Sequence, residues 1–364
     1  MTELIRERIG AWDTLGYRQE LFQNAKGRSC QVRQKETSRV ALWAKEKRKG
    51  TVEKAVVRAL RIGDVSKALR LLCSAPLADK GPETVAALRE LHPVGARPEP
   101  VAPCPSPHWT AETVGPALCS FSPSSAAGLF GYTPFHLQQC YGEESWSFSG
   151  ALIRAVNQLS NGDAPTFLKP FLAGGVSIAL QKKGTGVRPL CCGDPLRRLV
   201  AKCFCLGAKS EITTAFEGLN YGVGCKGGVE VVAHSLRDTL HKHAESDLGL
   251  LKIDFSNAFN QVNRAAFMQA TCQTFPGLAN WTNWCYQEES TLLFDHREVI
   301  TSSSGVQQGD PLSPLYFCFA LNGLVQEISS LKPEYQKWYM DDGGIVASVP
   351  VLLKVWALLK EKGP

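Results

Sequence analysis

The sequence predicts a mixed α/β protein preceded by a mostly α-helical, basic N-terminal region. The 364-residue chain is 44% hydrophobic and 20% charged, which is enough apolar material for a folded core and excludes a wholly disordered chain. A proline-rich stretch separates a helical pattern from one in which short apolar strands alternate with helices. No apolar run reaches the roughly 18–20 residues of a membrane span. The 13 cysteines include no C-x-x-C pair, which excludes a zinc knuckle or a disulfide framework.

The N-terminal region, residues 1–91, predicts helices and carries an excess of positive charge. Apolar residues recur at helical spacing within 35–71, and further helices are predicted at Val65–Cys73 and Glu83–Leu91. From Lys26 to Arg61 there are 12 Lys and Arg against three Glu, a net charge of +9 in a chain of net charge +6. This arm could bind nucleic acid or form a solvated helix face. The first residues contain no signal peptide, so we expect a nuclear or cytoplasmic protein, neither secreted nor in a membrane.

Residues 92–109 predict an extended linker and a domain boundary. Six prolines fall between Pro93 and Pro107, and proline lacks the N–H that helices and sheets require. Cys104 and His108 lie in this stretch, but no second pair of ligands stands nearby, so chance explains them better than a metal site.

After the linker, strands alternate with helices. One hairpin is predicted at 176–192 around a Gly-Thr-Gly turn, and another at 335–349 around an Asp-Asp-Gly-Gly turn. The other predicted elements are one strand, Gly249–Phe255, and helices at Pro195–Gly207, Val229–His243, Ala265–Gln273, Asp310–Ser329 and Val351–Lys360.

Carboxylates end one predicted strand and occupy the turn of one predicted hairpin. Asp254 ends an apolar strand, where a carboxylate needs a partner. Asp341 and Asp342 are adjacent at a hairpin apex and repel each other unless a cation neutralises them. Carboxylate oxygens suit Mg²⁺ or Mn²⁺. Taken singly, each aspartate could equally be a helix cap or a turn residue.

Two other segments could bind phosphate. The hairpin that carries Lys182 and Arg188 has no acidic residue up to position 193, which is typical of a phosphate clamp but also of an exposed basic hairpin. The loop with Gln308 and Gly309 precedes the long helix, where it would expose backbone N–H groups to a ligand. It could equally be an ordinary helix start capped by Asp310.

The basic hairpin, the aspartate at a strand end, the glycine-containing loop and the Asp-Asp hairpin follow one another along the chain. Together they resemble the fingers and palm of a reverse transcriptase. The resemblance rests on a Y-x-D-D box at Tyr339–Asp342, a Q-G-x-P-L-S-P loop at Gln307–Pro314, a first Asp motif at Asp254–Phe259 and the basic fingers hairpin. Residues 123–137 resemble the fingers entry of non-LTR retrotransposon enzymes. The departures from the motifs of that family are Leu129, Phe130, Thr133 and Asn220, the last at a position where Gln is common.

The resemblance implies an α+β palm-and-fingers polymerase fold. The fingers and the start of the palm would occupy 110–247, and the palm would occupy 248–364, ending before a thumb. Two Mg²⁺ (or Mn²⁺) ions would be held by Asp254, Asp341, Asp342 and the Phe255 carbonyl, with the three aspartates catalytic. Lys182 and Arg188 would clamp the incoming dNTP, and the Phe259 ring would exclude a 2′-OH. Gln308 and Gly309 would contact the nucleotide, and Tyr339 and Met340 would pack near the primer terminus.

The expected function is therefore that of an RNA-directed DNA polymerase domain of a retroelement. It would extend a DNA primer on an RNA template by two-metal nucleotidyl transfer to the 3′-OH. Two alternatives remain from the residues: a non-catalytic nucleic-acid-binding relic and an RNA-templated RNA polymerase with the same palm. Because no thumb follows, we expect this chain alone to be inactive or non-processive and to expose Leu352, Val355 and Leu359 of its last helix. The residues do not indicate an oligomeric state.

Overall fold

The computed structural model describes most of the chain beyond residue 75 and part of the chain before it. The described residues are 53–54, 56–57, 60, 65–73, 76–122, 125–142, 146–182, 184 and 186–363. The chain divides into two compact units, 1–75 and 76–364. In the first unit, the helix predicted at Val65–Cys73 is observed as α4, and its Ala68 is buried in a small cluster with Val56. The basic arm lies almost entirely outside the described residues.

The proline-rich segment 92–109 is extended, as its prolines predict, but it is tied to the second unit. The carboxamide of Asn283, on α15 (Ala279–Tyr286), accepts a hydrogen bond from the Val101 N–H at 3.0 Å and donates to the Val101 carbonyl at 2.8 Å. Asn157, on α8 (Trp146–Ser160), makes the same pair of bonds to Trp109, both at 2.8 Å. Because these contacts hold the segment against helices, the boundary between the compact units falls at residues 75 and 76, before it.

The first sheet has four strands in the order β2-β1-β4-β5. The predicted hairpin at 176–192 is observed as β1 (Gly175–Gln181) and β2 (Val187–Gly193), which pair antiparallel. β1 also pairs in parallel with β4 (Ser290–Phe294), which forms a second hairpin with β5 (Glu298–Ser302). One face of this sheet packs on α5 (Pro82–Leu91) through Val85 and Leu88, which bury alternate strand residues such as Ala179 and Val187.

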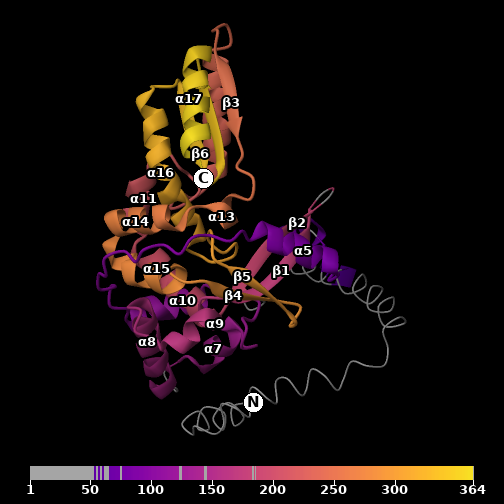
Figure 1. Ribbon diagram of the computed structural model, residues 1–364, viewed down its shortest axis with the longest axis vertical. Helices are drawn as coiled ribbons and strands as arrows, with labels where there is room; N and C mark the ends of the chain where they lie inside the picture. The colour runs from indigo at the N-terminus through magenta and orange to yellow at the C-terminus, as the bar shows by residue number, and fades with distance from the viewer. Residues whose placement is uncertain are drawn as a thin grey trace. The chain divides into compact units, whose positions relative to one another are not determined.

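The second sheet has three antiparallel strands in the order β3-β7-β6. They are β3 (Gly249–Ile253), β6 (Tyr335–Tyr339) and β7 (Asp342–Ala347), so the hairpin predicted at 335–349 is confirmed. Ile253, Trp338 and Ile345 turn to the main core, where they join α16 (Ser313–Ser330) and α17 (Val349–Lys362). α17 contacts β3, β7 and α16, an arrangement visible in Figure 1, and α12 (Gly228–Lys242) lies on β6.

The remaining helices pack around the main core, which includes residues of the second sheet, while the buried face of the first sheet forms a separate cluster with α5. Among them, α10 (Pro195–Gly207) has the predicted bounds. The others are α6 (Ala111–Cys119), α7 (Pro134–Cys140), η3 (Thr166–Leu168), α9 (Lys169–Leu172), α11 (Lys209–Phe216), α13 (Ala258–Gln261), α14 (Arg264–Thr274) and η4 (Pro276–Leu278). None of the helices in the described part of the chain is long and apolar enough to cross a membrane. The mixed α/β class predicted from the sequence is confirmed.

Two local expectations are wrong. The long helix starts at Ser313 rather than at Asp310, because Asp310 accepts a hydrogen bond from the Leu312 N–H at 2.9 Å and holds a turn ahead of the helix. In the last helix, Val355 and Leu359 are buried rather than exposed, since they face α16 and the second sheet. The outward face of α17 instead carries Leu353 and Trp356.

Candidate active site

Three aspartates gather at one end of the second sheet. Asp254 directly follows β3, Asp342 is the first residue of β7, and Asp341 lies in the turn that joins β6 to β7. In the antiparallel register Ile253 lies opposite Gly343, so the next step along β3 brings Asp254 level with Asp342. Sheet pairing therefore places side by side carboxylates that lie almost ninety positions apart in the sequence.

The electrostatics of Asp341 report this proximity. Burial raises the pKa of the half-buried Asp341 carboxyl, and the charges of Asp342 and Asp254 raise it further, while Arg188 acts in the opposite direction. Burial chiefly, and the Asp341 charge in addition, raise the pKa of the Cys318 thiol on α16. The charge of Asp341 therefore interacts with both acidic neighbours and with Cys318 of α16. Its negative charge is disfavoured there unless a cation is present.

The basic hairpin of the first sheet carries a positive charge that acts on this acidic group. Arg188 pairs across the hairpin with Leu180, so by alternation Leu180, Arg188 and Lys182 share one face, while Val187 and Ala179 face α5. Arg188 is exposed and its charge lowers the pKa of Asp341, which sets it within electrostatic range of the carboxylates. Lys182 is exposed just beyond the end of β1, and its N–H donates to the Gly186 carbonyl at 3.1 Å.

The loop before α16 runs beside the hairpin. The Gln308 carbonyl accepts a hydrogen bond from the Cys191 N–H of β2 at 2.6 Å. Gly309 has a φ of 116°, and a Cβ there would lie 2.5 Å from the Cys191 carbonyl oxygen. Only glycine fits this combination of backbone angle and close approach. The Gln308 side chain is half-buried and Gly309 is exposed, so both predicted nucleotide contacts lie at the surface next to β2.

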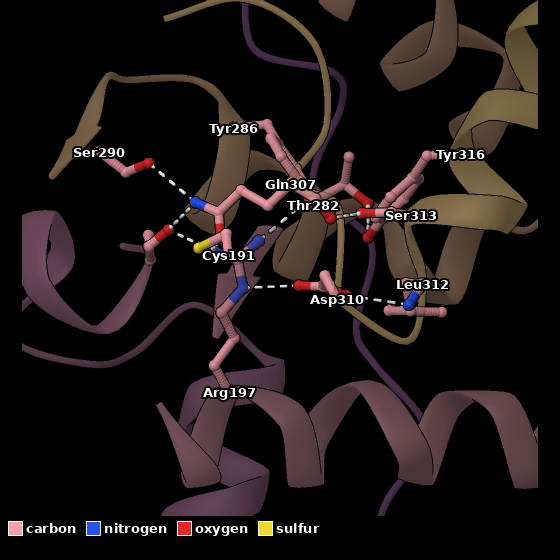
Figure 2. A network of polar contacts seen from close by, with 11 residues as sticks. Cys191, Arg197, Thr282, Tyr286, Ser290, Gln307, Asp310, Leu312, Ser313 and Tyr316 are labelled. Atoms are coloured by element: carbon pink, nitrogen blue, oxygen red, sulfur yellow. Dashed lines mark hydrogen bonds and ion pairs between the residues drawn. The ribbon is translucent and has the colours of Figure 1, made fainter. Parts of the chain in front are cut away.

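A buried polar network holds this loop in place (Figure 2). Arg197 of α10 is 1% exposed and donates to Asp310 at 2.6 Å, to Gln307 at 2.8 Å and to the Tyr286 hydroxyl at 3.0 Å. The Gln307 amide in turn donates to the Ala173 carbonyl at 2.7 Å. Burial lowers the pKa of Arg197, but the Asp310 carboxylate and, to a smaller extent, Tyr286, Cys285 and Cys191 together raise it well above the usual value.

Sequence reasoning did not find this network. It placed Asp310 in the loop and cap before the long helix and Arg197 within the helix predicted at Pro195–Gly207, without a contact between the two. The available signal was the apolar surroundings of Arg197 in the sequence, since Leu196, Leu199 and Val200 flank it. A charged residue inside an apolar run indicates a buried partner.

The two predicted phenylalanines line the region between the carboxylates and the core. Phe259 is half-buried and stacks on Phe317, with ring centroids 5.2 Å apart. Its carbonyl accepts a hydrogen bond from the Val306 N–H at 2.7 Å. Phe255, next to Asp254, stacks on Trp338 with ring centroids 6.3 Å apart. Each ring therefore has a core partner on one face, and the gate role of Phe259 stays a prediction.

The donor chemistry of the aspartates fits a hard divalent cation. Asp254, Asp341 and Asp342 offer only carboxylate oxygens, which Mg²⁺ and Mn²⁺ prefer, and a cation would relieve the repulsion that raises the pKa of Asp341. In the part of the chain that the structure describes, no three His, Cys, Asp or Glu side chains are already arranged to hold a metal ion. The residue types are therefore suitable, and a closed coordination shell would require the side chains to adjust.

Comparisons with known proteins agree with this description. Residues 180–355 match the family described as reverse transcriptase (RNA-dependent DNA polymerase). The matched segment contains Lys182 and Arg188 of the basic hairpin, the loop before α16 and all three aspartates, and it is similar to reverse-transcriptase-like polymerases. No curated protein matches the chain.

Among solved structures, apo telomerase from Candida tropicalis, truncated from its C-terminal domain, is 16% identical with a TM-score of 0.39. The match covers 53% of this chain and 48% of the telomerase chain, so this chain spans about half the length of that relative. Similarity at this level carries no argument about activity.

Proposed function

We propose that residues 110–364 form the fingers and palm of an RNA-directed DNA polymerase of the non-LTR retrotransposon type. The observation that carries the proposal is the convergence of Asp254, Asp341 and Asp342 at one end of a sheet, with Arg188 within electrostatic range of Asp341. The match to the reverse transcriptase family supports the class of polymerase. The type of element rests on the resemblance of residues 123–137.

Each site residue has a chemical role in this proposal. Divalent cations bound by Asp254, Asp341, Asp342 and the Phe255 carbonyl would supply the Lewis acidity for nucleotidyl transfer. Arg188 and Lys182, on one face of their hairpin, neutralise the triphosphate of a dNTP.

The other site residues orient the substrates. Gln308 and Gly309 lie beside β2, where they contact the incoming nucleotide. Tyr339 and Met340 enter the catalytic turn and pack near the primer terminus. Phe259 is stacked on Phe317 and leaves no room for a 2′-OH.

The basic arm adds a second contact to nucleic acid in this proposal. Its excess of Lys and Arg between residues 26 and 61 would bind phosphates of the template–primer duplex without reading sequence. Such binding weakens steeply with salt, with a log–log slope of about 0.7–0.9 per phosphate neutralised. If the affinity for nucleic acid does not depend on salt, the arm is a solvated helix face and does not bind phosphates.

Single-nucleotide addition to a DNA primer on an RNA template tests the proposal, because it requires no processive synthesis. With Mg²⁺ or Mn²⁺ and one dNTP, we expect addition by the wild-type chain, and its loss in Asp341→Ala and Asp254→Ala. Asp247→Ala is the matched control, since Asp247 is exposed near the opposite end of β3.

Three results would contradict the proposal. Equal addition by Asp341→Ala and wild type would exclude a catalytic role for the aspartates. Preferred incorporation of ribonucleotides would favour an RNA polymerase. Binding of the primed template with no addition under either metal would favour a non-catalytic nucleic-acid-binding protein.

A further inference from the structure

The turn that carries Asp341 is held by a side chain from a distant segment. Asn220 is 5% exposed, and its Oδ1 accepts hydrogen bonds from the Met340 N–H at 3.2 Å and from the Gly222 N–H at 3.0 Å. Its Nδ2 donates to the Met340 carbonyl at 3.4 Å. The carboxamide therefore contacts both backbone polar groups of the residue that directly precedes Asp341.

The backbone around Asn220 is fixed against β6. The Trp338 N–H donates to the Leu219 carbonyl and the Tyr221 N–H donates to the Trp338 carbonyl, both at 2.8 Å. These bonds form a parallel β-bridge between Asn220 and Trp338. They leave the Asn220 side chain at the end of β6, where the turn to β7 begins. Gly222 allows the close approach, because a Cβ there would lie 2.5 Å from the Met340 nitrogen.

The turn needs such support because of its backbone conformation. Met340 has a φ of 56°, in the left-handed region that residues other than glycine rarely adopt. Left-handed residues of this kind persist where the surroundings over-determine them, and they concentrate at functional sites. Here the carboxamide of Asn220 supplies two of the hydrogen bonds that fix the backbone of Met340. Because Met340 directly precedes Asp341, its backbone conformation sets the direction in which the Asp341 side chain leaves the turn.

We infer that Asn220 is a positioning residue of the polymerase site, which orients the Asp341 carboxylate by fixing the Met340 peptide. The inference rests on the proposed function, and it adds a residue that acts through Asp341 rather than on the substrate. Asn220 lies 120 positions before Met340, and the resemblance assigned it no role in the site.

The chain offers a matched control for the loss of a carboxamide clamp. Asn283 makes the same two bonds, to the N–H and the carbonyl of Val101, on a helix that carries none of the predicted catalytic or substrate-binding residues. Asn283→Ala should lower stability as Asn220→Ala does, without changing the site. If both variants lose stability but only Asn220→Ala changes the site, the effect of Asn220 is on positioning and not on stability in general.

The first measurement is amide hydrogen exchange, which requires no turnover. In Asn220→Ala the amides of Met340 and Gly222 should exchange faster, while those that pair β3 with β7 keep their protection. Asn220→Asp retains Oδ1 as acceptor and should restore the protection. Unchanged exchange at Met340 in Asn220→Ala would overturn the inference, whether or not the wild-type chain adds nucleotides.

The second measurement is single-nucleotide addition, with kcat and KM for the dNTP determined separately. We expect kcat to fall about tenfold or more in Asn220→Ala, since a displacement of 1 Å can cost about a hundredfold in rate, with KM within about twofold because Asn220 does not touch the nucleotide. Asn283→Ala should keep the wild-type kcat.

Asp341→Ala separates the two possible failures. If it leaves addition unchanged, the proposed function is wrong. If it abolishes addition while Asn220→Ala keeps the wild-type kcat, only the positioning role is wrong.

Discussion

Replacing Arg197 by Met should destabilise the folded chain by about 3–5 kcal/mol, the usual cost of removing one partner of a buried ion pair. The side chains of Arg197 and Asp310 are 0% and 4% exposed, and their charged atoms are 2.6 Å apart. Without the guanidinium, the Asp310 carboxylate keeps the Leu312 N–H as a donor but loses its counter-charge. Methionine fills a similar volume, so the loss reports the charge and not a cavity.

Urea unfolding followed by tryptophan fluorescence measures this loss. Arg89→Met is the control, because Arg89 pairs with Glu298 at 2.9 Å at the surface, with side chains 58% and 45% exposed, and such pairs contribute about 0–1 kcal/mol. A domain is stable by only about 5–15 kcal/mol, so Arg197→Met could leave little folded protein. Tyr286→Phe then serves as a milder variant. It removes one hydrogen bond to the guanidinium, at a cost of roughly 1–3 kcal/mol.

The reasoning is refuted if Arg197→Met costs no more than Arg89→Met. That result would mean that the Asp310 carboxylate finds water or another cation when Arg197 is absent, and that the loop before α16 does not depend on the buried pair. A loss confined to nucleotide addition, with unchanged unfolding, would equally contradict a structural role for the network.

Four further predictions concern the site itself. Because burial and two acidic neighbours raise the folded-state pKa of Asp341, stability should fall as pH rises from the ordinary aspartate pKa of about 3.9 through the raised value. The free energy of unfolding of Asp341→Asn, measured by urea titration, should then be larger than that of the wild type at neutral pH and equal to it in acid. Added Mg²⁺ should reduce the difference at neutral pH. Gly309→Ala should lower the urea midpoint more than Gly131→Ala. Both glycines have positive φ, but only the Cβ at 309 would meet backbone, and equal losses would exclude the clash with β2. In steady-state assays Arg188→Ala should raise KM for the dNTP more than it lowers kcat, and Phe259→Val should admit ribonucleotides. An unchanged KM, or no ribonucleotide incorporation, would remove the respective residue from the nucleotide site.

Features that depend on neighbouring residues could be predicted from the sequence. The bounds of α4 and α10 agree with the prediction, since apolar periodicity and an N-terminal cap or proline are local signals. The hairpins of β1–β2 and β6–β7 follow from strand patterns around glycine-containing turns. The same local chemistry identified the carboxylates at a strand end and at a hairpin turn as candidates for a shared site.

Only the tertiary structure decided which distant side chains support the site. Arg197 meets Asp310 across 113 positions and Asn220 meets Met340 across 120. The apolar neighbours of Arg197 indicate that it has a buried partner, but no local pattern identifies the partner of either residue. The hairpin of β4 and β5 and the packing of the proline-rich segment also escaped prediction, because both depend on partners elsewhere in the chain. The sequence by itself predicted helices such as α4 and α10, the hairpins β1–β2 and β6–β7, and the candidate chemical groups of the site. The fold determined their orientation, because a buried polar group is stable only where long-range packing supplies its partner.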